Sequence, residues 1–78
     1  MNPNQYAIST RNLTSEAVGD FVSLDITGKR EWYRIASIIF DDTGLSLIAD
    51  ITDDVQIRKL YAEPTTLHLM RAKDDTDV

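Results

Sequence analysis

The chain has 78 residues, of which 42% are hydrophobic and 27% charged, and it contains no cysteine. This length allows one domain, near the lower limit at which a single hydrophobic core suffices, and this composition is typical of a folded chain. The lack of cysteine excludes disulfides and thiolate metal sites, and a net charge of −5 argues against a general nucleic-acid-binding surface, which needs excess positive charge.

The first ten residues, MNPNQYAIST, lack the basic start and the apolar run of a signal peptide. No segment is long and apolar enough to span a bilayer, so we expect a soluble, cytoplasmic protein with no membrane contact. Tyr6 and Ile8 are spaced as in a short edge strand. Residues 10–17 predict one helical turn, with Leu13 and Val18 reaching the core.

A first main strand is predicted over residues 21–26, FVSLDI, directly after the break at Gly19 and Asp20. Val22 and Leu24 lie on one face of that strand and are expected to cover the core. The next four residues, TGKR, predict a connecting loop whose glycine supplies the turn.

Residues 31–51 predict a central β-hairpin around the sequence DDTG at 41–44, which has the favoured residues of a type I turn. A turn there places Phe40 opposite Leu45 and Ile38 opposite Leu47. The predicted core face consists of Ala36, Ile38, Phe40, Leu45, Leu47 and Ala49.

The other face of the hairpin is predicted to be partly wet, with one apolar spot made by Ile39 and Ile48. Its remaining members are Ser37, Ser46 and Asp50. The alternation slips upstream, because Tyr33 and Ile35 have the opposite parity to the core residues. A one-residue bulge between residues 34 and 37 would bring both sets to the core and bend the strand.

The rest of the chain predicts two more strands. Residues 52–54 form a polar turn, residues 55–60 a half-exposed strand, and Pro64 interrupts the pattern. Residues 65–71 predict the last strand, with its two leucines pointing one way and His68 the other. The last seven residues, AKDDTDV, carry three aspartates, and we predict a disordered acidic tail over residues 72–78 after a single domain over residues 1–71.

Five short strands separated by turn signals indicate an all-β fold. The runs GDFVSL, GKREWYRIASI, GLSLIADI and TTLHLMR resemble the small SH3-like barrels of bacterial and phage proteins, most of them uncharacterised. The resemblance covers about residues 18–71. It implies a five-stranded SH3-like barrel, preceded by a short N-terminal turn or edge strand.

Trp32 and Tyr33 are the only adjacent aromatic residues, and neighbours in a strand face opposite sides. One ring is therefore expected to be buried and the other displayed. The displayed ring could act with Ile39 and Ile48 as an interface anchor. The alternative is that Trp32 covers the barrel end as ordinary packing.

Catalytic and metal sites are not indicated. His68 is the only histidine, and no acid or nucleophile is placed to work with it, so we expect a surface residue. The aspartate pairs at 41–42 and 53–54 lack the alternating ligands and glycine of a calcium loop, and aspartate is a common turn residue. We expect no enzyme activity, no cofactor and no metal.

The leading functional interpretation is a non-enzymatic module that binds a protein partner or itself, in a phage or mobile-element protein acting on a host factor. Its predicted binding residues are Trp32, Tyr33, Ile39 and Ile48. Two alternatives stay open. One is nucleic-acid binding through Lys29, Arg30, Arg34, Arg58 and Lys59. The other is an acidic DNA mimic that uses the tail with Asp20, Asp25, Asp41, Asp42, Asp50, Asp53 and Asp54.

Overall fold

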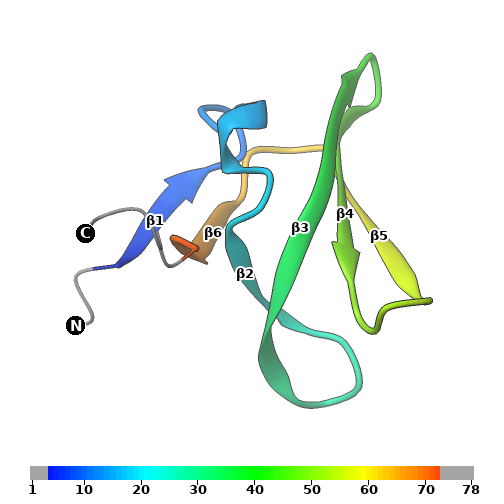
Figure 1. Ribbon diagram of the computed structural model, residues 1–78. Coiled ribbons are helices and arrows are strands. Elements are labelled where there is room, and N and C mark those ends of the chain that lie inside the picture. The colour runs from blue at the N-terminus through cyan, green and yellow to red at the C-terminus, as the bar shows by residue number, and fades with distance from the viewer. Residues whose placement is uncertain (1–3, 73–78) are drawn as a thin grey trace.

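The computed structural model describes residues 4–72 and shows six strands and one 3-10 turn (Figure 1). The elements are β1 (Gln5–Ser9), η1 (Ser15–Ala17), β2 (Phe21–Asp25), β3 (Arg30–Asp41), β4 (Gly44–Asp50), β5 (Gln56–Tyr61) and β6 (Thr66–Met70). The prediction of an all-β fold is confirmed. The short edge strand predicted around Tyr6 and Ile8 is confirmed as β1.

All six strands form one antiparallel sheet in the order β1-β6-β2-β3-β4-β5. The sheet is not closed, because β1 and β5 are its two ends and do not pair with each other within residues 4–72. Figure 1 shows β3 as the long strand between β4 and β5 on one side and β2, β6 and β1 on the other. The structure therefore supports a small, curved all-β fold, and the closed five-stranded SH3-like arrangement stays a prediction.

The predicted hairpin register is confirmed at the turn, where Phe40 faces Leu45 and Ile38 faces Leu47. The Asp41 carboxylate accepts hydrogen bonds from the Thr43 backbone N–H at 2.8 Å and from the Thr43 hydroxyl at 2.5 Å. These bonds hold the pKa of the Asp41 carboxyl below its usual value. The side chain of Asp41 thus fixes the turn that sets the register of both strands.

Gly44 cannot be replaced in this turn by a residue with a side chain. Its φ of +131° is rarely adopted by residues with a side chain. A Cβ at this position would lie 2.9 Å from the Cα of Ala62 and would collide with the carbonyl oxygen of Tyr61. The glycine allows β5 to pack closely against the start of β4.

The predicted bulge in β3 is confirmed. Ile35 pairs with Ala49 and Ser37 with Ile48, so Ala36 is the extra residue and the register shifts there. The shift brings Ile35, which is completely buried, onto the same face as Leu47. This face of the sheet, called the inner face below, carries the hydrophobic core.

The core is one cluster of buried side chains drawn from β2, β3, β4, β6 and the segment around η1. Its buried members are Leu13, Ala17, Val22, Leu24, Ile35, Leu45, Leu47, Ala49, Leu67 and Leu69. The predicted inward positions of β2 and β6 are therefore confirmed.

Phe40 was predicted to lie in the core, and this is wrong, because 55% of its surface is exposed. The reason is that β2 pairs only with Arg30 to Arg34 of β3. Beyond that point β4 is the only described strand that pairs with β3. The partner residue Leu45 is covered from both sides, by Phe40 and by Tyr61, whereas Phe40 lies at an open edge.

The predicted helical turn is confirmed as η1, where the Thr14 hydroxyl accepts a hydrogen bond from the Glu16 N–H at 3.3 Å. Leu13 is buried as expected. Val18 was also expected in the core, and this is wrong. It is exposed, and the smaller Ala17 takes the inward position under the one-turn helix.

The two ends of the described chain are joined through Asp20. Its carboxylate accepts a hydrogen bond from the Tyr6 hydroxyl at 2.8 Å and another from the Ala72 N–H at 3.2 Å. The guanidinium of Arg71 lies 4.7 Å from the centre of the Tyr6 ring. Partial burial of Tyr6, together with its bond to the Asp20 carboxylate, raises its pKa to about 12.

The predicted acidic tail, residues 72–78, lies outside the described residues except for Ala72. Within residues 4–72 we find no helix with the length and apolar character of a membrane span.

Candidate interaction surfaces

The structure separates the four predicted binding residues into three places. Trp32 and Tyr33 lie on opposite faces of β3, as predicted: Tyr33 pairs with Val22 on the inner face and is half-buried, and Trp32 pairs with Ser23 on the outer face and is exposed. Ile39 and Ile48 lie beyond the bulge, on the outer face of the β3–β4 hairpin. Trp32 and the two isoleucines therefore share a sheet face but not a single patch.

An apolar patch covers the outer face of β3, β4 and β5. The cross-strand register aligns Ile39, Ser46 and Leu60 in one row and places Ile48 two residues along β4, diagonal to Ile39 as predicted. Ile39 is 43% exposed and Leu60 is 53% exposed, whereas Ile48 is half-buried. We call Ile39, Ile48 and Leu60 the outer apolar patch.

Ser46 lies at the centre of the patch and is completely buried, although the sequence predicts it on a wet face. The face is predicted correctly but the exposure is wrong. The cause is Arg58, whose Nε and Nη2 donate hydrogen bonds to the Ser46 hydroxyl at 3.1 and 2.9 Å. The guanidinium lies over the serine and satisfies its hydroxyl, so it stabilises the patch rather than extending freely into water.

Polar residues border the patch on the side away from the turn. Ser37 and Arg58 are the cross-strand neighbours of Ile48, and the next row contains Asp50 and Gln56. The Gln56 amide donates a hydrogen bond to the Asp50 carboxylate at 2.7 Å. An apolar centre with a polar border is the usual arrangement of a protein-binding surface.

The sequence interpretation missed Leu60. The signal was available, because the polar turn at 52–54 fixes the pairing of β4 with β5 as the turn at 41–44 fixes that of β3 with β4. Counting outward from the second turn places Leu60 opposite Ser46, on the face of Ile48.

Trp32 lines a separate hollow of about 630 Å³ on the outer side of β6, β2 and β3. Arg30, Ser23 and His68 line the same hollow. The ring therefore does not extend the outer apolar patch.

The five basic residues of the nucleic-acid alternative do not form one surface. Arg30 and Arg34 lie on the outer face of β3, on either side of Trp32, and Arg34 is opposite the acidic Asp50. Arg58 covers Ser46. Lys59 occupies the inner face of β5, opposite Leu47, and Lys29 lies in the loop before β3.

The candidate catalytic and metal-binding residues are also dispersed. His68 is exposed on the outer face of β6, opposite Ala7 of β1, which agrees with its prediction as a surface strand residue. The aspartate pairs at 41–42 and 53–54 occupy the turns at the two ends of β4. Within residues 4–72, no three histidine or acidic side chains form a group that could hold a metal ion.

No protein-family model, curated protein or solved structure matches this chain.

Proposed function

We propose that the chain is a non-enzymatic interaction module that binds a protein partner, or a second copy of itself, through the outer apolar patch. The observation that carries this proposal is the position of Ile39 and Leu60. Both are large aliphatic residues that are about half exposed, and they lie on the outer face, apart from the hydrophobic core.

The energetics favour a contact at this patch. Fully burying an aliphatic side chain of this size contributes about 1.5–3 kcal/mol. Ile39 and Leu60 flank a serine that is already hydrogen-bonded, so a partner that covers them leaves no polar group of Ser46 unsatisfied. Such a desolvated apolar centre is typical of the few residues that dominate binding energy.

The contact is proposed on the sheet face rather than on the sheet edge. β5 is an end strand of the sheet, and an unpaired edge can accept an added strand. However, its central residues Arg58 and Lys59 place a cation on each face of that edge. Charges of this kind on an edge strand disfavour strand addition.

The charge distribution gives less support to the two alternatives. The cations of the nucleic-acid alternative are divided between both sheet faces and a loop. The paired aspartates of the DNA-mimic alternative lie at opposite ends of β4. A bacterial host protein is the proposed partner if the chain is a phage or mobile-element protein.

The test compares captured proteins and self-association for the original chain and two patch variants, Leu60→Glu and Ile39→Glu. Val55→Glu is the matched control, because Val55 is 50% exposed and lies outside the patch. We expect both patch variants to lose the captured partner, identified after cross-linking, or the dimer seen by analytical ultracentrifugation. The control should retain either.

Equal capture and equal self-association by Leu60→Glu and Val55→Glu would contradict the proposal. The proposal would also be contradicted if the original chain were monomeric and captured the same proteins as the patch variants.

A further inference from the structure

The pairing between β2 and β6 stops early and leaves a cleft. Only Phe21 with Met70 and Val22 with Leu69 pair, although both strands continue beyond these residues. The Ser23 carbonyl oxygen is reached instead by Nη1 of Arg30 at 3.1 Å, and the same nitrogen lies 3.3 Å from the Ser23 hydroxyl. A side chain of β3 thus takes the place of the missing strand partner.

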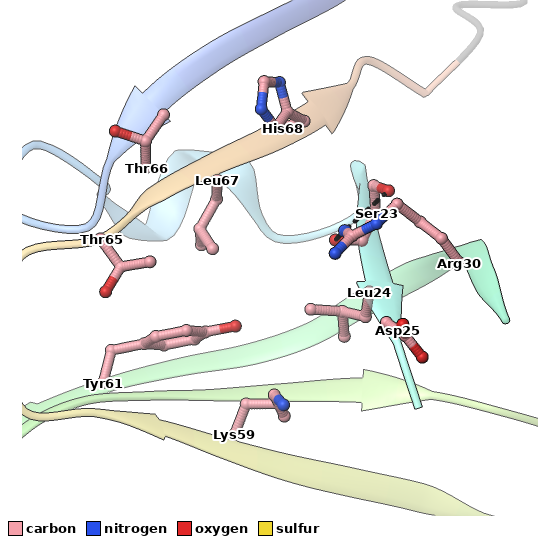
Figure 2. Close-up of a pocket in the computed structure, with 10 residues that line it drawn as sticks. All are labelled: Ser23, Leu24, Asp25, Arg30, Lys59, Tyr61, Thr65, Thr66, Leu67 and His68. Carbon is pink, nitrogen blue, oxygen red and sulfur yellow. Dashed lines mark hydrogen bonds between the residues drawn. The ribbon is translucent and has the colours of Figure 1, made fainter. Parts of the chain in front are cut away.

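The cleft is bounded by apolar and hydroxyl groups and has a volume of about 330 Å³. The buried side chains of Leu24 and Leu67 form its floor, and the half-buried ring of Tyr61 forms a wall (Figure 2). Figure 2 shows Thr65 and Leu67 pointing from the β6 side toward Tyr61. This volume is at the lower end of the range for small-molecule sites, about 300–1,000 Å³.

Two permanent cations, Lys59 and Arg30, line this cleft of an otherwise acidic protein. His68 lines it as well, but Figure 2 shows its ring on the side of β6 away from Leu67. Asp25 is the one acidic residue in the lining, and its carboxylate accepts a hydrogen bond from the Gly28 N–H at 3.1 Å. The cleft therefore carries a net positive charge.

Lys59 indicates what kind of ligand the cleft could bind. It is half-buried on the inner face, in the row of Ile38 and Leu47, and it makes no hydrogen bond or ion pair with any residue in 4–72. Its ammonium has no counter-charge among the described residues. An anion in the cleft would supply the missing partner.

We propose that this cleft binds a small organic anion, with its carboxylate or phosphate oxygens on Lys59 and Arg30 and its apolar body on Leu24, Leu67 and Tyr61. The hydroxyl of Tyr61 is an additional hydrogen-bond donor for the anion. Arg30 reaches this site from the outer face, whereas Lys59 and Tyr61 reach it from the inner face. None of the lining residues belongs to the outer apolar patch, so either proposal can fail without the other.

The test is an NMR titration of the intact chain with three probes: benzoate, inorganic phosphate and benzylamine. Benzoate carries an anionic and an apolar part, phosphate carries only the anion, and benzylamine reverses the charge. We expect saturable shifts at Leu24, Tyr61 and Leu67 with benzoate. Phosphate should produce the same pattern with at least about tenfold weaker affinity because it lacks the apolar contact, and benzylamine should produce no saturation.

Equal affinity for phosphate and benzoate would show that the cleft binds the oxyanion alone, and would overturn the apolar part of the proposal. Saturation with benzylamine, or benzoate shifts that do not localise to the cleft, would overturn the proposal altogether.

Variants test the role of the ammonium. Lys59→Gln should weaken benzoate binding about tenfold, the range for a charged hydrogen bond, and Lys59→Arg should restore most of it. Lys29→Gln removes the same charge from the exposed loop and should leave binding unchanged. Equal weakening in Lys29→Gln and Lys59→Gln would reveal a nonspecific charge effect and contradict the proposal. The titration of the original chain locates the site even if Lys59→Gln does not fold.

Discussion

The outer apolar patch and the β2–β6 cleft make opposite use of the same sheet. The patch is a surface of exposed aliphatic side chains in which the one buried polar group, the Ser46 hydroxyl, is satisfied by Arg58. The cleft has an apolar floor that is buried and a lysine that has no partner within residues 4–72. The patch therefore lacks only apolar cover, whereas the cleft lacks only a counter-charge.

One strand supplies both surfaces. In β5, Arg58 and Leu60 point to the outer face, whereas Lys59 and Tyr61 point to the inner face and line the cleft. A slip of one residue in the pairing of β4 and β5 would exchange these two sets. The register set by the turns is thus what keeps the outer apolar patch apart from the residues of β5 that line the cleft.

The largest expected effect comes from breaking that register at Gly44. Gly44→Ala introduces a side chain at a positive φ and against the backbone of Tyr61 and Ala62, so both surfaces should be disrupted together. We expect a loss of about 2–4 kcal/mol in the free energy of unfolding, measured with urea. Gly28→Ala is the control, because Gly28 has a φ of +84° with no atom near the added carbon. It should lose only about 1 kcal/mol, and equal losses would show that the close approach at Gly44 is unimportant.

Arg58→Met should affect the outer apolar patch and not the cleft, because it removes only the guanidinium that binds Ser46. The methionine still covers Ser46, whose buried hydroxyl loses its two hydrogen bonds, so we expect a loss of about 1–2 kcal/mol in thermal or urea unfolding. Arg34→Met removes an outer-face cation for which no hydrogen bond is found within residues 4–72, and it should have little effect. If the two variants were equally stable, the Arg58–Ser46 contact would not stabilise the fold.

Tyr6→Phe affects the β1–β6 side of the sheet, away from the outer apolar patch. Losing the hydrogen bond to Asp20 should lower the free energy of unfolding by about 1 kcal/mol at neutral pH. The pKa of Tyr6 is raised to about 12 from an ordinary 10, so folding favours its neutral form. Its contribution is present below pH 10 and is lost as the pH rises from 10 to 12.

The difference between the original chain and Tyr6→Phe should therefore shrink across that pH window in urea titrations. Tyr33 and Tyr61, whose pKa values are also raised, are common to both proteins and do not affect the difference. A difference that is constant from pH 8 to 12 would contradict the assigned role of the Tyr6 hydroxyl.

The smallest effect is expected at Phe40. Because more than half of its surface is exposed at the open end of the hairpin, Phe40→Ala should cost less than about 1 kcal/mol. Leu47 is completely buried, so Leu47→Ala should lower the free energy of unfolding by about 2–5 kcal/mol. If both variants lost the same free energy of unfolding, Phe40 would contribute to the core as Leu47 does. The open end of the hairpin would then not differ from the rest of the inner face.

Much of the fold could be predicted because turns and alternation are local. The residues of the DDTG turn determine which side chains oppose each other, and the parity change between Tyr33 and Ala36 reveals the bulge. Exposure was harder to predict because it depends on strand neighbours distant in the chain. Phe40 and Val18 have core-like identities. They are exposed because β2 pairs with β3 only as far as Arg34 and because η1 turns inward at Ala17.

The two surfaces differ in the same way. The diagonal of Ile39 and Ile48 follows from one hairpin, so the sequence locates it. The cleft depends on where β6 diverges from β2, two strands that are far apart in the chain, and no local pattern encodes that divergence. The buried serine under Arg58 likewise depends on a long side chain crossing between strands.

The most direct test of the proposed function is the stability of a double variant, Ile39→Glu with Leu60→Glu, measured by urea unfolding alongside partner binding or self-association. If these side chains serve recognition, the free energy of unfolding should change by less than about 1 kcal/mol while binding is lost. A loss of about 3 kcal/mol or more would show that both residues belong to the core, and would contradict the assignment of this face to a partner.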